Sequence, residues 1–296
     1  MIEATTEQPS PFHKGEVALQ QSVGVAERME KFGKRVIRDF MPDQHRDFYA
    51  QLPFIVLGAV DPAGDAWVTL LSGKPGFMHS PDPRKLDFAV TPDPRDPASA
   101  GLGEGSAIGL LGIELHTRRR NRMNGIVHRN GDGRFTVAVE HAFGNCPQYI
   151  QLRDWQMARD PGDHAGLPQA QQIDPADPRA TALISAADTF FVASYLDDEQ
   201  GRHVDASHRG GKPGFVRINT DGSLTIPDFA GNLHFNTLGN FLLNPKAGLV
   251  FCDFETGDML QLTGEAEVVL DSPEIATFQG AERLWVFRPR RVILRE

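Results

Sequence analysis

Apolar residues recur at helical spacing near the start of the chain. Between residues 16 and 40 they return every three or four positions, with Glu, Arg and Lys between them. This period predicts an amphipathic helix that is interrupted near Gly24. Pro42 ends that pattern, and Asp43 is expected to cap a second helix that runs to residue 52. Residues 1–15 are polar and predict a loosely attached arm.

From residue 54 onward the pattern changes to short apolar or alternating runs separated by turn residues. Such runs predict many short antiparallel strands and therefore a barrel or sandwich. We expect strands at residues 54–60, 66–71, 77–78, 86–88, 107–115, 122–127, 134–140, 190–196, 203–207 and 283–294.

A stretch rich in Pro, Asp, Gly and Gln divides the strand pattern. It covers residues 159–178 and is predicted to be a linker, followed by a short helix over 178–187. The expected organisation is a helical arm (1–46), a first β unit (47–158) and a second β unit (179–296). A further short helix is expected over residues 238–244.

The two β units resemble each other in sequence. Gly-Lys-Pro-Gly-Phe occurs at 73–77 and again at 211–215, and residues 109–117 run parallel to residues 248–256. The offsets, 211 − 73 = 138 and 248 − 109 = 139, are nearly constant. We therefore predict a tandem duplication of one mainly β unit, with a period far longer than that of a solenoid repeat.

Charge and cysteine content restrict the classes of partner. The chain of 296 residues has a net charge of −9, which argues against nucleic acid or an anionic membrane as the main partner. Two cysteines imply no disulfide framework, and no basic, apolar leader precedes the first helix. No run of about 18 apolar residues occurs. These features predict a cytoplasmic protein.

Residues 203–268 carry the densest mixture of strand-like runs with Arg, Ser, Lys and Gly. Charge-assisted donors combined with glycines, whose backbone N–H groups can approach closely, suit a phosphate site. The alternative interpretation is an antiparallel hairpin with polar turns.

These segments resemble the pyridoxamine 5′-phosphate oxidase-like flavoproteins, whose fold is the FMN-binding split β-barrel. The resemblance covers residues 47–267 and is sharpest at 205–216, 227–232, 237–240 and 260–264. Residues 145–150 are similar to a segment of larger members that carry reductase and ferredoxin-like modules. The resemblance implies a mainly β fold with peripheral helices, in which tandem split β-barrels form an internal pseudo-dimer with flavin between them.

The resemblance also implies a set of cofactor-binding residues. Ser207 and Arg209 would hold the FMN phosphate, while Asn232 and Gln261 offer amides to the cofactor. Thr237 and Asn240 are further candidates, with helix capping as their alternative role. Contacts from the second side are expected from Lys74, Arg122 and Cys146.

The two copies differ in the residues that would bind phosphate. Aligning Gly211 with Gly73 places Thr69 opposite Ser207 and Leu71 opposite Arg209. We therefore expect one phosphate pocket in the chain, built by the second copy and roofed by the first. His208 and His234 stand where additional cations are expected.

The basic stretch 117–125 and Cys146 each allow two interpretations. The arginines at 118, 120 and 122 share one face of a strand and form either a solvated sheet edge or a docking surface for a phosphorylated ligand. Cys146 is either a buried structural thiol or a reactive one. The histidines show no metal-binding spacing, so no metal site is expected, and no Rossmann fingerprint is present.

The interpretation as a whole is an FMN-dependent oxidoreductase that acts on a small-molecule substrate, with NAD(P)H as a candidate electron donor. No residue stands out as a catalytic acid or base. A separate reductase or ferredoxin and a homodimer are candidate partners. The alternative is a non-catalytic module that binds flavin or haem.

Overall fold

Three helices form the N-terminal part of the protein. The structure is a computed structural model that describes residues 10–131, 133–157, 159–163 and 166–296, so most of the loosely attached arm predicted at residues 1–15 lies outside the described residues. The helices are α1 (Lys14–Ser22), α2 (Ala26–Val36) and α3 (Asp43–Gln51). The predicted interruption is confirmed, because Gly24 adopts a φ of 70° between the first two helices. Asp43 does not cap α3: it lies in the first turn, and the N-cap is Pro42.

The first copy is an open antiparallel sheet of seven strands in the order β2-β1-β5-β6-β7-β4-β3. A short 3-10 helix, η1 (Pro97–Gly101), covers β1 and β2. The strands are β1 (Phe54–Val60), β2 (Ala66–Ser72), β3 (Met78–His79), β4 (Lys85–Phe88), β5 (Ala107–Glu114), β6 (Arg119–Arg129) and β7 (Phe135–Gly144).

The second copy is a sheet whose main path runs β10-β9-β13-β14-β15-β12-β11. The stretch predicted as a linker contributes β8 (Gln171–Ile173), which pairs with β15. Helices α4 (Pro178–Ala186) and α5 (Asn236–Leu243) and the 3-10 helix η2 (Pro273–Thr277) accompany the sheet. Its strands are β9 (Thr189–Asp198), β10 (Gly201–Gly210), β11 (Arg217–Ile218), β12 (Leu224–Phe229), β13 (Lys246–Cys252), β14 (Met259–Val269) and β15 (Ala281–Arg295).

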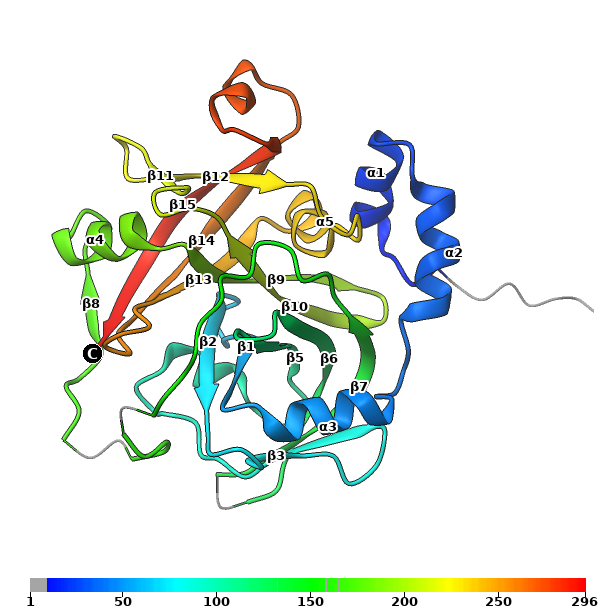
Figure 1. The fold of residues 1–296 in the computed structure, drawn as a ribbon, viewed down its shortest axis with the longest axis vertical. Helices are drawn as coiled ribbons and strands as arrows, with labels where there is room; N and C mark the ends of the chain where they lie inside the picture. The colour runs from blue at the N-terminus through cyan, green and yellow to red at the C-terminus, as the bar shows by residue number, and fades with distance from the viewer. Residues whose placement is uncertain (1–9, 132, 158, 164–165) are drawn as a thin grey trace, which may run out of the picture.

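The two sheets have one topology, as the predicted duplication requires. Replacing β1 by β9, β2 by β10 and so on through β7 and β15 converts the first strand order into the second. Even the irregularity is repeated: the register shifts at Asn124/Gly125 in the first copy and at Thr263/Gly264 in the second. A bulge at equivalent positions is a conserved device of one backbone design. The fold is therefore mainly β, with tandem open sheets forming an internal pair (Figure 1).

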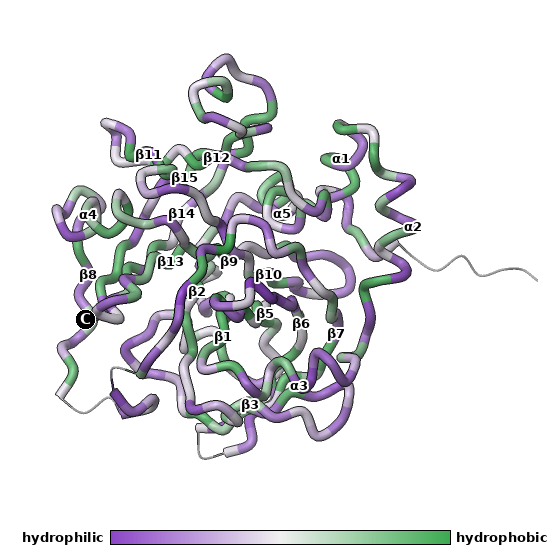
Figure 2. Tube along the Cα trace, viewed as in Figure 1, coloured by the Kyte–Doolittle hydropathy of each residue, from purple (hydrophilic) through white to green (hydrophobic). Residues whose placement is uncertain are grey.

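The copies pack face to face through a shared apolar cluster. Val56 and Leu111 of the first sheet meet Phe191 and Val250 of the second, and all four are fully buried. Figure 2 shows the hydrophobic residues along β1 and β13, near the middle of the molecule. Burial of apolar surface from both copies stabilises their association.

Two equivalent glycines set the distance between the sheets. A Cβ on Gly109 of β5 would lie 2.5 Å from the carbonyl oxygen of Val204 in β10. A Cβ on Gly248 of β13 would lie 2.5 Å from the carbonyl oxygen of Ala66 in β2. Both contacts are with backbone, which cannot rotate away, so any side chain would separate the sheets.

We predict that Gly109→Ala and Gly248→Ala each lower the free energy of unfolding by about 1–3 kcal/mol, because each methyl group overpacks the interface. Gly103→Ala is the matched control, since its nearest neighbour is the Ser106 hydroxyl at 3.4 Å. Its effect should stay within about 0.5 kcal/mol. Urea denaturation measures all three variants. Equal stabilities would show that the sheets are not held at this distance by the glycines.

Candidate functional site

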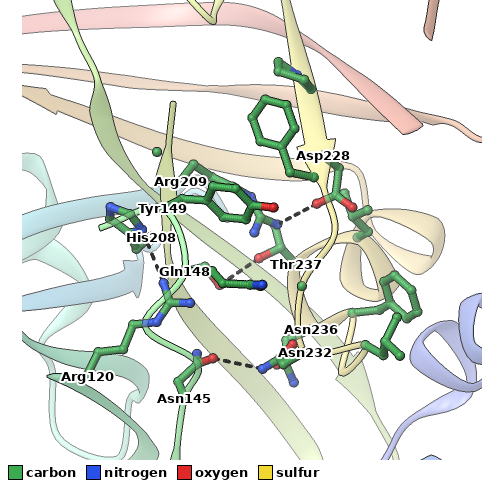
Figure 3. Close-up of a pocket in the computed structure, with 18 of the residues that line it drawn as sticks. Arg120, Asn145, Gln148, Tyr149, His208, Arg209, Asp228, Asn232, Asn236 and Thr237 are labelled. Atoms are coloured by element: carbon green, nitrogen blue, oxygen red, sulfur yellow. Dashed lines mark hydrogen bonds and ion pairs between the residues drawn. The ribbon is translucent and has the colours of Figure 1, made fainter. Parts of the chain in front are cut away.

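A cavity of about 90 Å³ lies between the two copies, at the end of α5 that follows the 230–235 loop. The second copy supplies β10, the end of β12 and the start of α5; the first copy supplies β6 and the segment after β7 (Figure 3). We call it the arginine cavity, because its lining carries four guanidinium groups and a single carboxylate among the described residues: Arg120, Arg122, Arg209, Arg283 and Asp228.

Arg122 joins the two copies inside this cavity. It is 5% exposed, and its Nη2 donates a hydrogen bond to Ser207 Oγ at 2.6 Å. Its Nη1 donates to Asn236 Oδ1 at 2.6 Å and lies 3.7 Å from Asp205 Oδ1. Ser207 Oγ also accepts from Thr237 Oγ1 at 2.8 Å. The predicted residue Ser207 thus meets an arginine of the other copy, and the predicted residue Thr237 contacts Ser207.

Arg209 lies two residues beyond Ser207 on β10. Its Nη2 is 3.7 Å from Asp228 Oδ1, while Asp228 Oδ2 accepts a hydrogen bond from Arg283 Nη1 at 2.9 Å. Burial raises the pKa of the Asp228 carboxyl, and the two arginines oppose that rise. Since Asp228 is shared with Arg283, it neutralises Arg209 incompletely.

The remaining arginine of the first copy adds to the positive charge. Burial, then the nearby Arg122 and Arg209, lower the pKa of Arg120 to about 10, so it stays charged at neutral pH. His208 contacts Arg120 Nη1 through Nδ1 at 3.2 Å. Burial and the adjacent Arg120 lower the pKa of His208 well below its usual value, so this ring is neutral. The expected histidine cation is therefore absent at His208.

Unused hydrogen-bond donors accompany this charge. The Nε atoms of Arg120, Arg122 and Arg209 are buried and have no hydrogen-bond partner among the described residues. Buried donors without partners cost free energy, and like charges repel one another. A bound anion would relieve both costs.

The N-terminus of α5 points to the same chemistry. Asn236, Thr237 and Leu238, its first turn, line the arginine cavity. The residue at the N-cap is Phe235 with a φ of 61°, and no side chain caps the helix. Free N–H groups and the positive end of the helix dipole favour an anion at this point.

Two predicted residues lie beside these groups in different roles. Asn232 lines the cavity and donates from Nδ2 to Asn145 Oδ1 at 2.9 Å, which ties the two copies together at the rim. Asn240 is fully buried behind the cavity, where its Nδ2 donates to Ser194 Oγ and to Asp205 Oδ2, both at 2.9 Å. Asn240 therefore supports the site from the α5 interior and does not line it.

The structure does not bring the other predicted second-side residues into the lining. Lys74 is exposed and its Nζ pairs with Asp160 at 2.8 Å. Cys146 is a half-buried free thiol that follows Asn145 at the rim. His234 lies among Phe12, Phe32 and Phe143, and burial followed by the nearby Arg122 lowers its pKa to about 4. It too is neutral.

Gln261 does not lie with Ser207 in the arginine cavity. It occupies the position in the second copy that is equivalent to Arg122 of the first. In both copies the register pairs strands alike, so Gln261 of β14 corresponds to Arg122 of β6. Its Nε2 donates to Val68 O and to Asp96 Oδ1, both at 2.9 Å, and its Oε1 accepts from Arg295 Nε at 2.8 Å. Gln261 belongs to a closed polar network in the first copy's half of the interface.

The basic stretch is not a sheet edge. β6, which carries Arg120 and Arg122, lies between β5 and β7 in the middle of its sheet. Arg118 precedes the strand and adopts a φ of 59°. The solvated-edge interpretation is therefore wrong, because Arg120 and Arg122 face the second copy.

Sequence reasoning missed Asn236 and Arg283, which reach the cavity from α5 and β15. Arg120 was considered only as part of a docking surface for a phosphorylated ligand, because it shares a strand face with Arg122, and it lies in the lining. No local pattern signals Asn236 or Arg283, whose roles depend on tertiary contacts.

Comparison with known proteins yields structural matches alone. No protein-family model matches the sequence, and no curated protein matches it. The chain is similar to HupZ from Group A Streptococcus (16% identity, 38% of this chain, 86% of that one, TM-score 0.29). It is also similar to HutZ, the haem storage protein from Vibrio cholerae (17%, 40%, 94%, TM-score 0.29). A third match belongs to the pyridoxinephosphate oxidase family of Clostridium acetobutylicum (13%, 42%, 96%, TM-score 0.30).

In the described ranges, no helix is long and apolar enough to span a membrane. The same ranges contain no group of three or more His, Cys, Asp or Glu side chains suited to a metal ion.

The N-terminal helix is connected to the arginine cavity through a buried carboxyl group. Glu16 of α1 accepts hydrogen bonds from His13 N and from Asn236 Nδ2, and Asn236 in turn accepts from Arg122. Burial, then repulsion from Asp205, raises the pKa of Glu16 well above its usual 4.5. The folded protein therefore binds a proton at Glu16 more tightly than the unfolded chain does.

We predict that Glu16→Gln flattens the pH dependence of stability. The contribution of Glu16 is fully present below about pH 4.5 and is lost as the pH rises through the raised pKa. Melting temperatures of the parent protein should therefore fall, relative to the variant, as the pH rises above about 4.5. A difference that is constant with pH would contradict the assignment.

Proposed function

We propose that the arginine cavity binds the phosphate of FMN and that the chain is a flavin-dependent oxidoreductase. The observation that carries the proposal is the convergence of Arg120, Arg122 and Arg209, each with an unpartnered Nε, on the uncapped start of α5. Guanidinium groups and helix N-termini are the donors that proteins use for phosphate.

The size of the cavity suits the phosphate end of the cofactor. At about 90 Å³ it is much smaller than pockets that enclose whole ligands, which measure about 300–1,000 Å³. The ring system would therefore extend from the cavity along its rim. Tyr149 and Phe229 lie there with ring centroids 5.3 Å apart, and both line the cavity. Their rings offer apolar surface for a planar group.

Bound flavin would supply the hydride transfer chemistry, and the chain would bind and orient it. Arg209 and Arg122 are suited to hold the phosphate charge, and Ser207, which already accepts two hydrogen bonds, positions Arg122. NAD(P)H is the electron donor that we propose to test first.

A non-catalytic flavin- or haem-binding module is the second candidate. The observation that favours it is the absence of an evident acid or base in the described lining, where Asp228 is held in two ion pairs and His208 is neutral. Steady-state oxidation of NAD(P)H with added FMN separates the two candidates. If FMN binds saturably but no electron acceptor gives turnover, the result supports the non-catalytic binding module.

We predict that the protein binds FMN at least about 10-fold more tightly than riboflavin, which lacks the phosphate. Arg209→Leu introduces the residue found at the equivalent position of the first copy, Leu71. It should weaken FMN binding by about 10- to 100-fold and leave riboflavin affinity unchanged. Calorimetry measures both ligands and should give one FMN per chain.

Arg134→Leu is the matched control, because Arg134 is exposed and lies outside the cavity. The Arg209→Leu variant should still fold, because Asp228 keeps its 2.9 Å ion pair with Arg283. Equal affinity of the parent protein for FMN and riboflavin, or two FMN per chain, would refute phosphate binding at this cavity.

A further inference from the structure

A second cavity of about 690 Å³ occupies the position in the first copy that corresponds to the arginine cavity. We call it the twin cavity. Its inner wall is β2, the counterpart of β10, and its outer wall is formed by residues 154–157 and 159–163 together with Leu167. The loop between β13 and β14 closes one side, with Cys252 and Phe254 in the lining.

The residues that bind charge in the arginine cavity are replaced here by uncharged ones. The shared register places Leu71 at the position of Arg209, Gln261 at that of Arg122, and Met259 at that of Arg120. Each replacement removes a guanidinium group. The equivalent space in the first copy therefore lacks three guanidinium groups of the arginine cavity, although the strand pairing beneath the two spaces is the same.

The inner polar layer of the twin cavity is already satisfied. Asp96 accepts hydrogen bonds from Thr69 Oγ1, from Gln261 Nε2 at 2.9 Å and from Arg295 Nη2 at 2.7 Å. Thr69 corresponds to Ser207, and Asp96 takes the place that Thr237 has beside it. A phosphate would meet the Asp96 carboxylate and would have to compete for Arg295, so the twin cavity is not a second phosphate site.

The remaining lining is apolar, with an acidic rim. Eight carboxylate side chains and three guanidinium groups of described residues line the cavity. Several of these carboxylates are in ion pairs, but Asp154 and Glu255 are exposed and make no ion pair with any described residue. The apolar part of the lining is contributed by Phe54, Leu70, Leu115, Trp155, Met157 and Phe254.

We propose that the twin cavity binds a largely apolar small molecule that carries a positive charge, such as a protonated or quaternary amine on an aromatic or aliphatic body. The volume is in the range of pockets that enclose small ligands, about 300–1,000 Å³. Trp155 supplies a ring face that attracts cations, whereas the Phe254 ring already carries the Arg153 guanidinium 4.4 Å from its centroid and contributes apolar surface. Asp154 and Glu255 supply opposite charge. This site is independent of FMN binding in the arginine cavity.

The test uses tetraphenylphosphonium, an apolar cation, and tetraphenylborate, its anionic counterpart of similar shape. Trp155 is 44% exposed whereas Trp67 and Trp285 are fully buried, so fluorescence quenching reports on this cavity. We expect saturable quenching by the cation with one site per chain, at least about 10-fold tighter than by the anion. Trp155→Phe should abolish the signal, and calorimetry should still detect the cation.

Two kinds of variant locate the binding. Ser72→Trp fills the cavity from the exposed end of β2 and should weaken the cation by about 10-fold or more. Asp154→Asn and Glu255→Gln, which leave the core untouched, should each weaken it by about two- to fivefold. Arg209→Leu should have no effect on the cation, which separates this site from the arginine cavity.

Four results would overturn the proposal. The first three are non-saturable binding of the cation, equal or tighter binding of the anion, and cation affinity that neither Ser72→Trp nor the two charge variants change. The fourth is competition of FMN with the cation for one site, since the two cavities would then not be distinct.

Discussion

The burial of Arg122 between the two copies is the interaction on which the rest of the site depends. A guanidinium group can be buried only with hydrogen bonds and opposite charge, and Arg122 obtains these from Ser207, Asn236 and Asp205 of the second copy. These partners position the start of α5 and the hydroxyl of β10. Because Asn236 also donates to Glu16, the N-terminal helix is held by the same network. Removing one partner would leave a charge without compensation.

The close approach of the sheets makes this exchange of side chains feasible. Gly109 and Gly248 bring β5 against β10 and β13 against β2, so that side chains of one copy reach hydrogen-bond distance of the other. The same geometry occurs twice, once on each side of the approximate two-fold relation between copies. On one side it places Arg122 beside Ser207, and on the other it places Gln261 beside Asp96. The backbone thus provides two equivalent spaces, and side chains decide what each can bind.

Much of the fold could be predicted from local patterns. The repeated Gly-Lys-Pro-Gly-Phe and the short strands indicated two copies of one mainly β unit, and the strand orders confirm this. The alignment of Leu71 with Arg209 also agrees with the strand register. These features depend on neighbours along one strand or on direct repetition, which a single sequence displays.

The composition of the site was harder to predict, because it depends on which copy each side chain faces. Gln261 was expected with Ser207, but its side chain on β14 faces the first copy, where its Nε2 donates to Val68 O. The arginines of β6 were ambiguous because an edge strand and a central strand have the same local alternation. Only the pairing with β5 and β7 distinguishes them. The histidines at 208 and 234 have ordinary sequence surroundings, and their neutrality follows from burial near Arg120 and Arg122.

Covalent linkage of the copies explains how the two spaces could diverge. In a dimer of identical chains, a substitution that changes one interfacial site changes the other as well. In this chain the two sites are encoded separately, so Arg209 can stand in one while Leu71 stands in the other. Arginines in both cavities would place uncompensated positive charge twice in the interface between the copies. In the observed arrangement, the excess positive charge is confined to the arginine cavity. On the other side the Asp96 network satisfies its own polar groups, which stabilises the interface without any ligand. One half of the pair can therefore remain charged and incompletely satisfied, as anion binding requires, because the other half holds the copies together.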